Sequence, residues 1–202
     1  MIKLVGMMDS PYVRRVAISL ELYGVKFESQ PLSVFSTFDA FSRINPAVKA
    51  PTLVLDNGIR LMDSSLILNY FEAQADPERR LLPVAPDAQA NDLQTLGFIL
   101  AAAEKAVQNV YEHNLRPVEK QHVSWVERIT IQLLAACREW NTLLEGRPAT
   151  AVPDQVAVTS TVVWTFIQSM IPQVVNAADF RTIQAFAESF ESQPAFKKYP
   201  FN

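Results

Sequence analysis

The sequence predicts a small α/β domain followed by an all-helical domain, on the basis of three observations. Over the first 75 residues, the runs alternate in the order strand, helix, strand, then strand, strand, helix. Residues 76–90 carry three prolines among charged side chains, which is typical of a connection. Beyond them, apolar residues recur at spacings of three and four, the period of a helix. We expect the α/β domain at residues 1–77, a linker at 78–87 and the helical domain at 88–202.

Turn and cap residues set the elements of the α/β domain. Ser10 followed by Pro11 favours the start of a helix, and Gly24 favours its end. Asn57-Gly58 favours a hairpin turn between two short strands. In chain order, we expect a strand at 2–5, a helix at 11–23, a strand at 25–32, a short helix or turn at 38–44, strands at 52–55 and 59–62, and a helix at 64–75.

The second half of the chain has almost no strand signals. Apolar stripes over 93–110 and 126–143 predict two long helices, and the short connection at Arg116-Pro117 predicts that they pack antiparallel. Residues 154–170 are apolar nearly all round, so we expect a buried central helix there. A final amphipathic helix is expected over 178–191.

The composition excludes several classes of function. The chain has a net charge of −3 and no stripe of lysine or arginine, so we expect no nucleic-acid partner. Cys137 is the only cysteine, which rules out an intramolecular disulfide, and with His113 and His122 it forms no zinc-site spacing. There is no apolar run of membrane-spanning length and no signal-peptide pattern. We therefore expect a cytoplasmic protein that uses neither a membrane nor a metal.

Ser10 is the first candidate for chemistry. Its hydroxyl would stand at the positive end of the helix over 11–23, where an anion is stabilised. Taken alone, a Ser-Pro pair more often serves only as a helix cap.

Pro51 is the second candidate, because it precedes an apolar strand in whose ladder it cannot donate a hydrogen bond. A cis bond to Pro51 would leave the main chain of Ala50 facing outward, ready to pair with an extended peptide. On these residues alone we favour the other reading, an ordinary trans proline at a strand entrance.

Asp63-Ser64 is the third candidate, at the junction of a strand and a helix. The Ser64 hydroxyl and the free N–H groups of the helix could bind a carboxylate, while Asp63 could bind an ammonium group. Together they would match the zwitterionic end of an amino acid. Capping of the helix is the simpler role for either residue.

Read together, these features resemble the glutathione S-transferase family, of the serine type found in its theta, tau and zeta classes and in bacterial homologues. The resemblance implies a thioredoxin-like N-terminal domain and an all-α C-terminal domain. The position of Ser10 holds no cysteine, which disfavours disulfide exchange. The residues that carry the resemblance are Ser10-Pro11-Tyr12 with Arg15, Asn45-Pro46 with Lys49-Ala50-Pro51-Thr52-Leu53, and Asp63-Ser64 with Ile67.

The resemblance implies that glutathione is the co-substrate and that Ser10 is the catalytic residue. A free thiol has a pKa near ~8.5, so little of it is thiolate at neutral pH. Ser10 would donate a hydrogen bond to the sulfur anion and stabilise it. The other implied contacts are Ala50 and Pro51 at the cysteinyl backbone, Asp63 and Ser64 at the γ-glutamyl head, and Lys49 at the glycyl carboxylate.

The second substrate would be a small hydrophobic electrophile, bound by apolar side chains such as Met7, Met8, Tyr111 and Trp164. For each of these side chains, core packing is the role that the residues alone favour. The same thiolate would also serve dehalogenation, isomerisation or peroxide reduction, and a detoxifying and a metabolic role both stay open. A homodimer is implied as well. The alternative is a non-catalytic interaction or regulatory protein that keeps the fold.

One position departs from the family pattern. The buried core helix of the family often begins with a Ser/Thr-x-x-Asp capping box. Here Asp154 supplies the acid, but Ala151 stands where the hydroxyl belongs. Asp154 would then cap or brace the helix through another partner.

Overall fold

The computed structural model describes residues 1–147 and 152–202. These form two compact units, each described here by itself. Unit 1 comprises Met1–Leu82 together with Ser192–Asn202, and unit 2 comprises Pro83–Glu191. A small mixed sheet with helices makes up unit 1, and unit 2 is helical, so the predicted fold class is confirmed.

Unit 1 is built on a four-stranded sheet with the order β2-β1-β3-β4. The strands are β1 (Lys3–Val5), β2 (Glu28–Gln30), β3 (Thr52–Val54) and β4 (Arg60–Met62). β1 pairs in parallel with β2, whereas β3 runs antiparallel to both β1 and β4. The predicted strand, helix, strand, strand, strand, helix order is therefore confirmed, although each strand is only three residues long.

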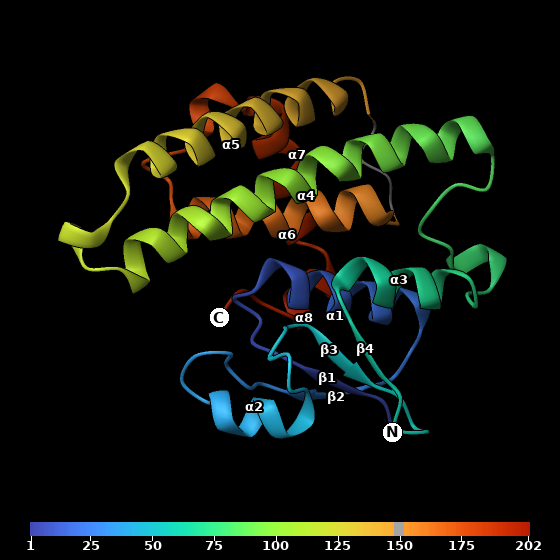
Figure 1. The fold of residues 1–202 in the computed structure, drawn as a ribbon. Coiled ribbons are helices and arrows are strands. Elements are labelled where there is room, and N and C mark those ends of the chain that lie inside the picture. Colours follow the sequence, from blue (N-terminus) through green and yellow to red (C-terminus); the bar gives the residue numbers. More distant parts are fainter. Residues whose placement is uncertain (148–151) are drawn as a thin grey trace. The chain divides into compact units, whose positions relative to one another are not determined.

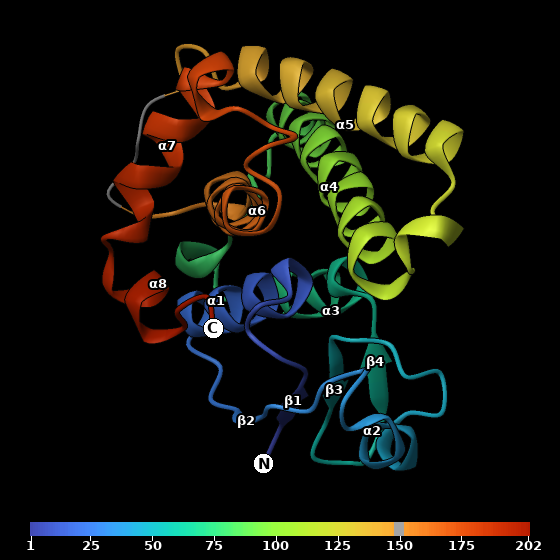
Figure 2. The same ribbon diagram turned by 90° about the vertical axis from the view of Figure 1, so that its left-hand side faces the viewer.

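The helices of unit 1 lie on both sides of this sheet (Figure 1). They are α1 (Pro11–Tyr23), α2 (Phe38–Ile44), α3 (Ser64–Glu72), the 3-10 turn η1 (Pro77–Arg79) and α8 (Pro194–Lys198). α1 and α3 pack side by side against the strands, and α2 lies on the opposite side (Figures 1 and 2). Their apolar faces close one core, which includes Leu4, Val13, Val16, Leu20, Leu53, Ile67 and Phe71.

The last residues of the chain return to α1, which the sequence did not predict. The Arg14 guanidinium donates from Nε to the carbonyl of Tyr199 at 2.8 Å. Lys198 Nζ lies 2.7 Å from Glu21 Oε2. The Tyr199 ring stacks on Phe27 with the ring centroids 5.6 Å apart. The C-terminal segment is therefore an integral part of unit 1.

Unit 2 is a bundle of helices. They are α4 (Pro86–Leu115), η2 (Val118–Lys120), α5 (Val123–Leu143), α6 (Gln155–Met170), η3 (Ala177–Asp179) and α7 (Arg181–Glu191). α4 and α5 pack antiparallel, as predicted (Figure 1). Figure 2 shows α6 end-on beside α4 and α7. Nearly every side chain in its first three turns is buried, so the predicted central helix is confirmed.

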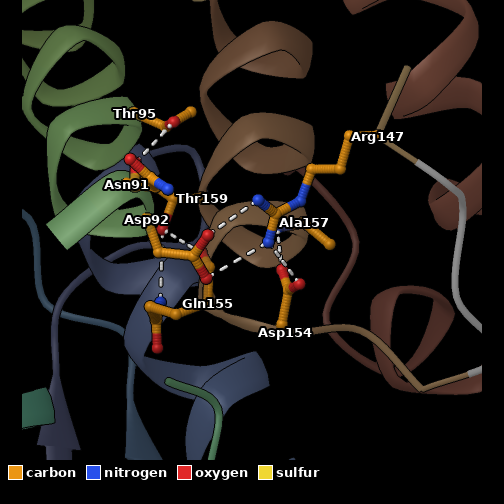
Figure 3. A network of polar contacts seen from close by, with 8 residues as sticks. All are labelled: Asn91, Asp92, Thr95, Arg147, Asp154, Gln155, Ala157 and Thr159. Carbon is orange, nitrogen blue, oxygen red and sulfur yellow. Dashed lines mark hydrogen bonds and ion pairs between the residues drawn. The ribbon is translucent and has the colours of Figure 1, made fainter. Parts of the chain in front are cut away.

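A charged network holds the start of α6 (Figure 3). Asp154 caps the helix by accepting from the Ala157 N–H at 2.8 Å. Its other carboxylate oxygen lies 2.6 Å from Arg147 Nη2, and the same guanidinium forms a two-point pair with Asp92 at 2.7 and 3.2 Å. Burial lowers the pKa of Arg147, but the hydrogen bonds to the two carboxylates raise it above its ordinary value. Asp154 was expected to brace the helix through another partner, and that partner is Arg147. Ala151, the other position of the expected capping box, lies outside the described residues.

Candidate functional site

Ser10 occupies the cap position before α1. Its Oγ accepts a hydrogen bond from the Val13 N–H at 3.4 Å, and Pro11 fills the first helical position. The first turn of α1 carries no acidic side chain that would offset the positive end of the helix dipole. Because a hydroxyl both accepts and donates, Ser10 keeps its proton for a further partner. The predicted cap is confirmed, and its geometry is compatible with a second bond to an anion.

Gly6 allows the loop before α1 to pass close to the entrance of β3. Its φ of +141° is unusual for any residue with a side chain. A Cβ at this position would lie 2.5 Å from Val13 Cγ2 and 3.2 Å from Ala50 Cβ. The loop that leads to Ser10 is therefore in close contact with Ala50.

The Ala50–Pro51 peptide bond is cis, so the trans bond favoured from the residues alone is wrong. The surrounding loop is fixed by side chains that the sequence reasoning did not use. The buried Asn45 donates from Nδ2 to Thr52 Oγ1 at 2.8 Å, and Thr52 Oγ1 donates to the Lys49 carbonyl at 2.6 Å. These bonds close the loop from its two ends and hold the turn that carries Ala50.

The main chain of Ala50 is available to a ligand. Between the residues that the structure describes, neither its N–H nor its carbonyl makes a hydrogen bond. Ala50 is only partly buried and lies two positions before Thr52, the first residue of β3. An extended peptide could pair with these groups as an added strand does.

Asp63 and Ser64 lie at the start of α3. Asp63 adopts a left-handed backbone conformation with φ of 70°, rare for a residue other than glycine, and its Oδ1 accepts from the Ser65 N–H at 2.9 Å. Lys49 Nζ lies 3.8 Å from Asp63 Oδ2, and both side chains are about half exposed. Lys49 thus lies near Asp63, the residue expected to bind the γ-glutamyl head. The role expected for Lys49, binding of the glycyl carboxylate, stays a prediction.

Arg15 is the residue that sequence reasoning missed, although it was part of the motif. It lies on α1 with only 3% of its surface exposed, and Nη1 donates to both Ser64 Oγ and Ser65 Oγ at 3.2 Å. Burial lowers its pKa to about 10, while the negative charge of Asp63 acts in the opposite direction. The structure buries every residue of α1 from Val13 to Leu20, which leaves no place for a solvated arginine. The only signal in the sequence was a pair of arginines within an otherwise largely apolar helix.

The expected glutathione contacts therefore converge in unit 1. Ala50 contacts the loop before α1, Lys49 reaches Asp63, and Arg15 joins α1 to Ser64.

The residues expected at an electrophile site are divided between the two units. Met8 is partly buried and packs on the core of unit 1. In unit 2, Tyr111 is 42% exposed, whereas Trp164 is buried. The Trp164 indole packs edge-on against Trp140 and Phe180 and donates to Gln184 at 2.5 Å. Core packing, the role that the residues favoured, is thus confirmed for Trp164, and its contact with a substrate stays a prediction.

The other candidates for chemistry were the single cysteine and a metal site. Cys137 is fully buried in α5, and burial raises the pKa of its thiol to about 12. Within residues 1–147 and 152–202, no three His, Cys, Asp or Glu side chains are grouped so as to hold a metal ion. Over the same ranges, no helix has the length and apolar character needed to cross a bilayer.

The chain is similar in sequence and in structure to known proteins. Residues 4–79 match the family model described as "Glutathione S-transferase, N-terminal domain". Glutathione S-transferase Z2 from Arabidopsis thaliana is 25% identical over 204 residues, which covers 97% of this chain and 89% of that protein.

Two solved structures resemble the whole chain. A glutathione S-transferase from Methylobacterium radiotolerans, in complex with glutathione sulfonate, has a TM-score of 0.88 at 22% identity and covers 100% of this chain and 95% of that chain. Ure2p5 from Phanerochaete chrysosporium, cocrystallized with 1-(S-glutathionyl)-2,4-dinitrobenzene, has a TM-score of 0.78 at 18% identity, covering 98% and 91%. At these identities the two structures establish the shared fold.

Proposed function

We propose that this chain works as the glutathione S-transferases that it resembles, joining the thiolate of glutathione to a small hydrophobic electrophile. In this reaction the sulfur anion attacks an electrophilic carbon and a new S–C bond forms. The leaving group departs with the electron pair of the bond that breaks. The protein's task is to provide the thiolate at neutral pH and to hold it beside the carbon.

The observation that carries the proposal is the cap geometry of Ser10. Its Oγ already accepts from the Val13 N–H, so the hydroxyl proton is the part of the group left to donate. A thiolate there would accept that proton's hydrogen bond and would also lie at the positive end of α1. Sites of this kind lower a thiol pKa by roughly one to several units. Ser10 thus stabilises the nucleophile and forms no bond to the electrophile.

The rest of the tripeptide would lie along the edge of unit 1. The unpaired main chain of Ala50 would take the cysteinyl backbone of glutathione in the manner of a β-strand. Asp63 would hold the ammonium group of the γ-glutamyl head, and Ser64 its carboxylate. Lys49 would be the cation for the glycyl carboxylate. Its 3.8 Å approach to Asp63 is a weak surface contact, which a ligand could displace at little cost.

Apolar side chains would receive the electrophile. Met8 would contribute an apolar surface beside the Ser10 loop, and Tyr111 and Trp164 are the candidates from unit 2. The conjugate held by the fungal structure, an S-aryl glutathione, is an example of the product that this chemistry gives.

We also infer a cytoplasmic homodimer. Unit 1 exposes large apolar side chains on β4 and α3, namely Met62, Leu66 and Tyr70, which are 42%, 64% and 39% exposed. An exposed apolar patch on a folded unit is typical of an interface. Sedimentation equilibrium would measure the mass of the particle, and a monomer at micromolar concentration would contradict the inference.

The first test is the binding of glutathione itself to the whole chain. Isothermal titration should give a dissociation constant between micromolar and millimolar. Turnover should follow when 1-chloro-2,4-dinitrobenzene is added, with absorbance of the conjugate as the readout. No heat of binding up to about ten millimolar glutathione would overturn the proposal and favour a non-catalytic interaction protein with the same fold.

A further inference from the structure

Asp9 is a carboxylate in the tight turn that leads into α1. The Ser10 N–H donates to the Met7 carbonyl at 3.2 Å, so Met8 and Asp9 form the corner of this turn. Asp9 is exposed and stands directly before Ser10. Because neighbouring Cα atoms are about 3.8 Å apart, the turn holds the Asp9 carboxylate near the hydroxyl that would hold the thiolate.

The charge of Asp9 is not compensated in the part of the chain that the structure describes, where its carboxylate forms no ion pair. The two cations of the glutathione side act on a different acid. Lys49 Nζ lies 3.8 Å from Asp63, and Asp63 is also the carboxylate whose charge acts on Arg15. Partial burial raises the pKa of the Asp9 carboxyl, while the N–H groups of Ser10 and of Asp9 itself lower it. Asp9 therefore keeps a negative field beside Ser10.

Neither the helix nor the thiolate requires this carboxylate. The cap of α1 is Ser10, which accepts from the Val13 N–H. A negative charge beside a forming sulfur anion raises the pKa of that thiol, so Asp9 opposes the thiolate. The other reactant is the electrophile, which must approach the same sulfur. A carboxylate at this place attracts an electrophile of positive charge and repels an anionic one.

We propose that Asp9 is a specificity-determining residue, which selects electrophiles that carry a positive charge on an apolar body. The inference rests on the proposed function and deepens it, because it names the charge of the second substrate. Met8, the partly buried neighbour of Asp9 in the turn, would contact the apolar body, and the Asp9 carboxylate would lie near the cationic group. Asp9 takes no part in the bond changes at sulfur and carbon.

The test compares three electrophiles on the whole chain at saturating glutathione. They are ortho-chloronitrobenzenes that differ only in the group para to the chlorine, which is trimethylammonium, carboxamide or carboxylate. Glutathione displaces chloride from each, so the S–C bond that forms and the C–Cl bond that breaks are the same. Each kcat/KM is divided by the rate constant of the uncatalysed reaction at the same pH and ionic strength. The readout is the ratio of these corrected values for the cationic and the anionic substrate.

The variants change one charge at a time. Asp9→Asn removes the charge at nearly constant volume, and Asp9→Glu keeps it. Asp39→Asn is the matched control, because Asp39 is an exposed aspartate of the same unit in the first turn of α2, which lies on the opposite side of the sheet from α1 (Figures 1 and 2). All three substrates react with the same thiolate, so a change in the thiolate fraction cancels in the ratio.

We expect the ratio of the wild type to exceed that of Asp9→Asn by about fivefold or more. The Asp9 carboxylate and the charged group of a bound substrate would lie within roughly 10 Å of each other, about one Debye length, so their interaction is only partly screened and has opposite signs for the two substrates. Asp9→Glu should keep most of the wild-type ratio, and Asp39→Asn all of it. Added salt should lower the ratio of the wild type and leave that of Asp9→Asn nearly unchanged.

Equal ratios in Asp9→Asn and the wild type would overturn the inference. If Asp9→Asn does not fold, Asp9→Ser takes its place. If neither variant folds, the wild type decides: a ratio that salt does not lower overturns the inference, and a ratio that falls with salt supports it. A wild type that conjugates none of the three electrophiles would instead refute the proposed function, whereas turnover of the carboxamide without any effect of Asp9 refutes this inference alone.

Discussion

Arg147 and Asp154 are joined by an ion pair of 2.6 Å across a stretch of chain that connects α5 to α6. The same guanidinium also holds Asp92 near the start of α4 at 2.7 Å. One cation therefore links three helices of unit 2, and it compensates two carboxylates, of which Asp92 is nearly buried.

Replacing Arg147 by Met should destabilise unit 2, because Asp92 would keep its burial and lose its counter-charge. We expect a loss of about 3 kcal/mol in the free energy of unfolding, the order found when one partner of a buried pair is removed. Urea denaturation followed by circular dichroism measures it. Arg138→Met, on an exposed position of α5, is the matched control and should change stability by less than about 0.5 kcal/mol. Equal midpoints for the two variants would show that the network adds no stability.

Replacing Ser10 by Ala should separate binding from chemistry. The contacts at Ala50 and Asp63 are untouched, so glutathione binding should stay within about threefold, while conjugation should slow by at least tenfold, about 1.4 kcal/mol of barrier. The ultraviolet absorbance of the bound thiolate should titrate at a higher pH than in the wild type. Ser10→Thr keeps the hydroxyl and the cap and is the control. A wild-type rate in Ser10→Ala would move thiolate stabilisation to another group.

Cys137 should make the protein less stable in alkali. Its folded pKa is raised from 9.0 to about 12, so between these values the unfolded chain loses a proton that the folded chain keeps. Stability contributed by this group is complete below pH 9 and is lost as the pH rises toward 12, at up to about 1.4 kcal/mol per pH unit. Urea denaturation of the wild type and of Cys137→Ala from pH 8 to 10.5 should give curves that converge with rising pH. Parallel curves would contradict the raised pKa.

Much of the fold was predictable because local signals and packing agree. The Ser10-Pro11 start and the Gly24 end of α1 match the structure residue for residue, since cap chemistry fixes helix ends directly. The strands were predicted too long: the run at 25–32 yields only Glu28–Gln30, because a three-residue ladder on β1 is all that the partner strand offers. Helix α8 was missed, as five residues with a single buried phenylalanine show no periodicity.

The candidate site was predictable in its residues but not in its connections. The sequence places Ser10 and Asp63 at helix starts and Ala50 just before a strand. The structure shows Ser10 and Asp63 as the cap residues of α1 and α3, and Ala50 two positions before β3. The cis bond before Pro51 was not predictable from the residues alone, which favoured trans. The contact of Arg15 with Ser64 spans 49 positions along the chain, and only the packing of α1 on α3 reveals it.

The return of the C-terminal segment to α1 has a consequence for the order in which the molecule is completed. Ser192–Asn202 are translated only after all of unit 2 has been translated. Until then, Arg14 lacks the Tyr199 carbonyl, and Glu21 lacks Lys198. Unit 1 is therefore completed only after unit 2 has been translated, and a nascent chain halted at Glu191 would carry all of unit 2 and an incomplete unit 1.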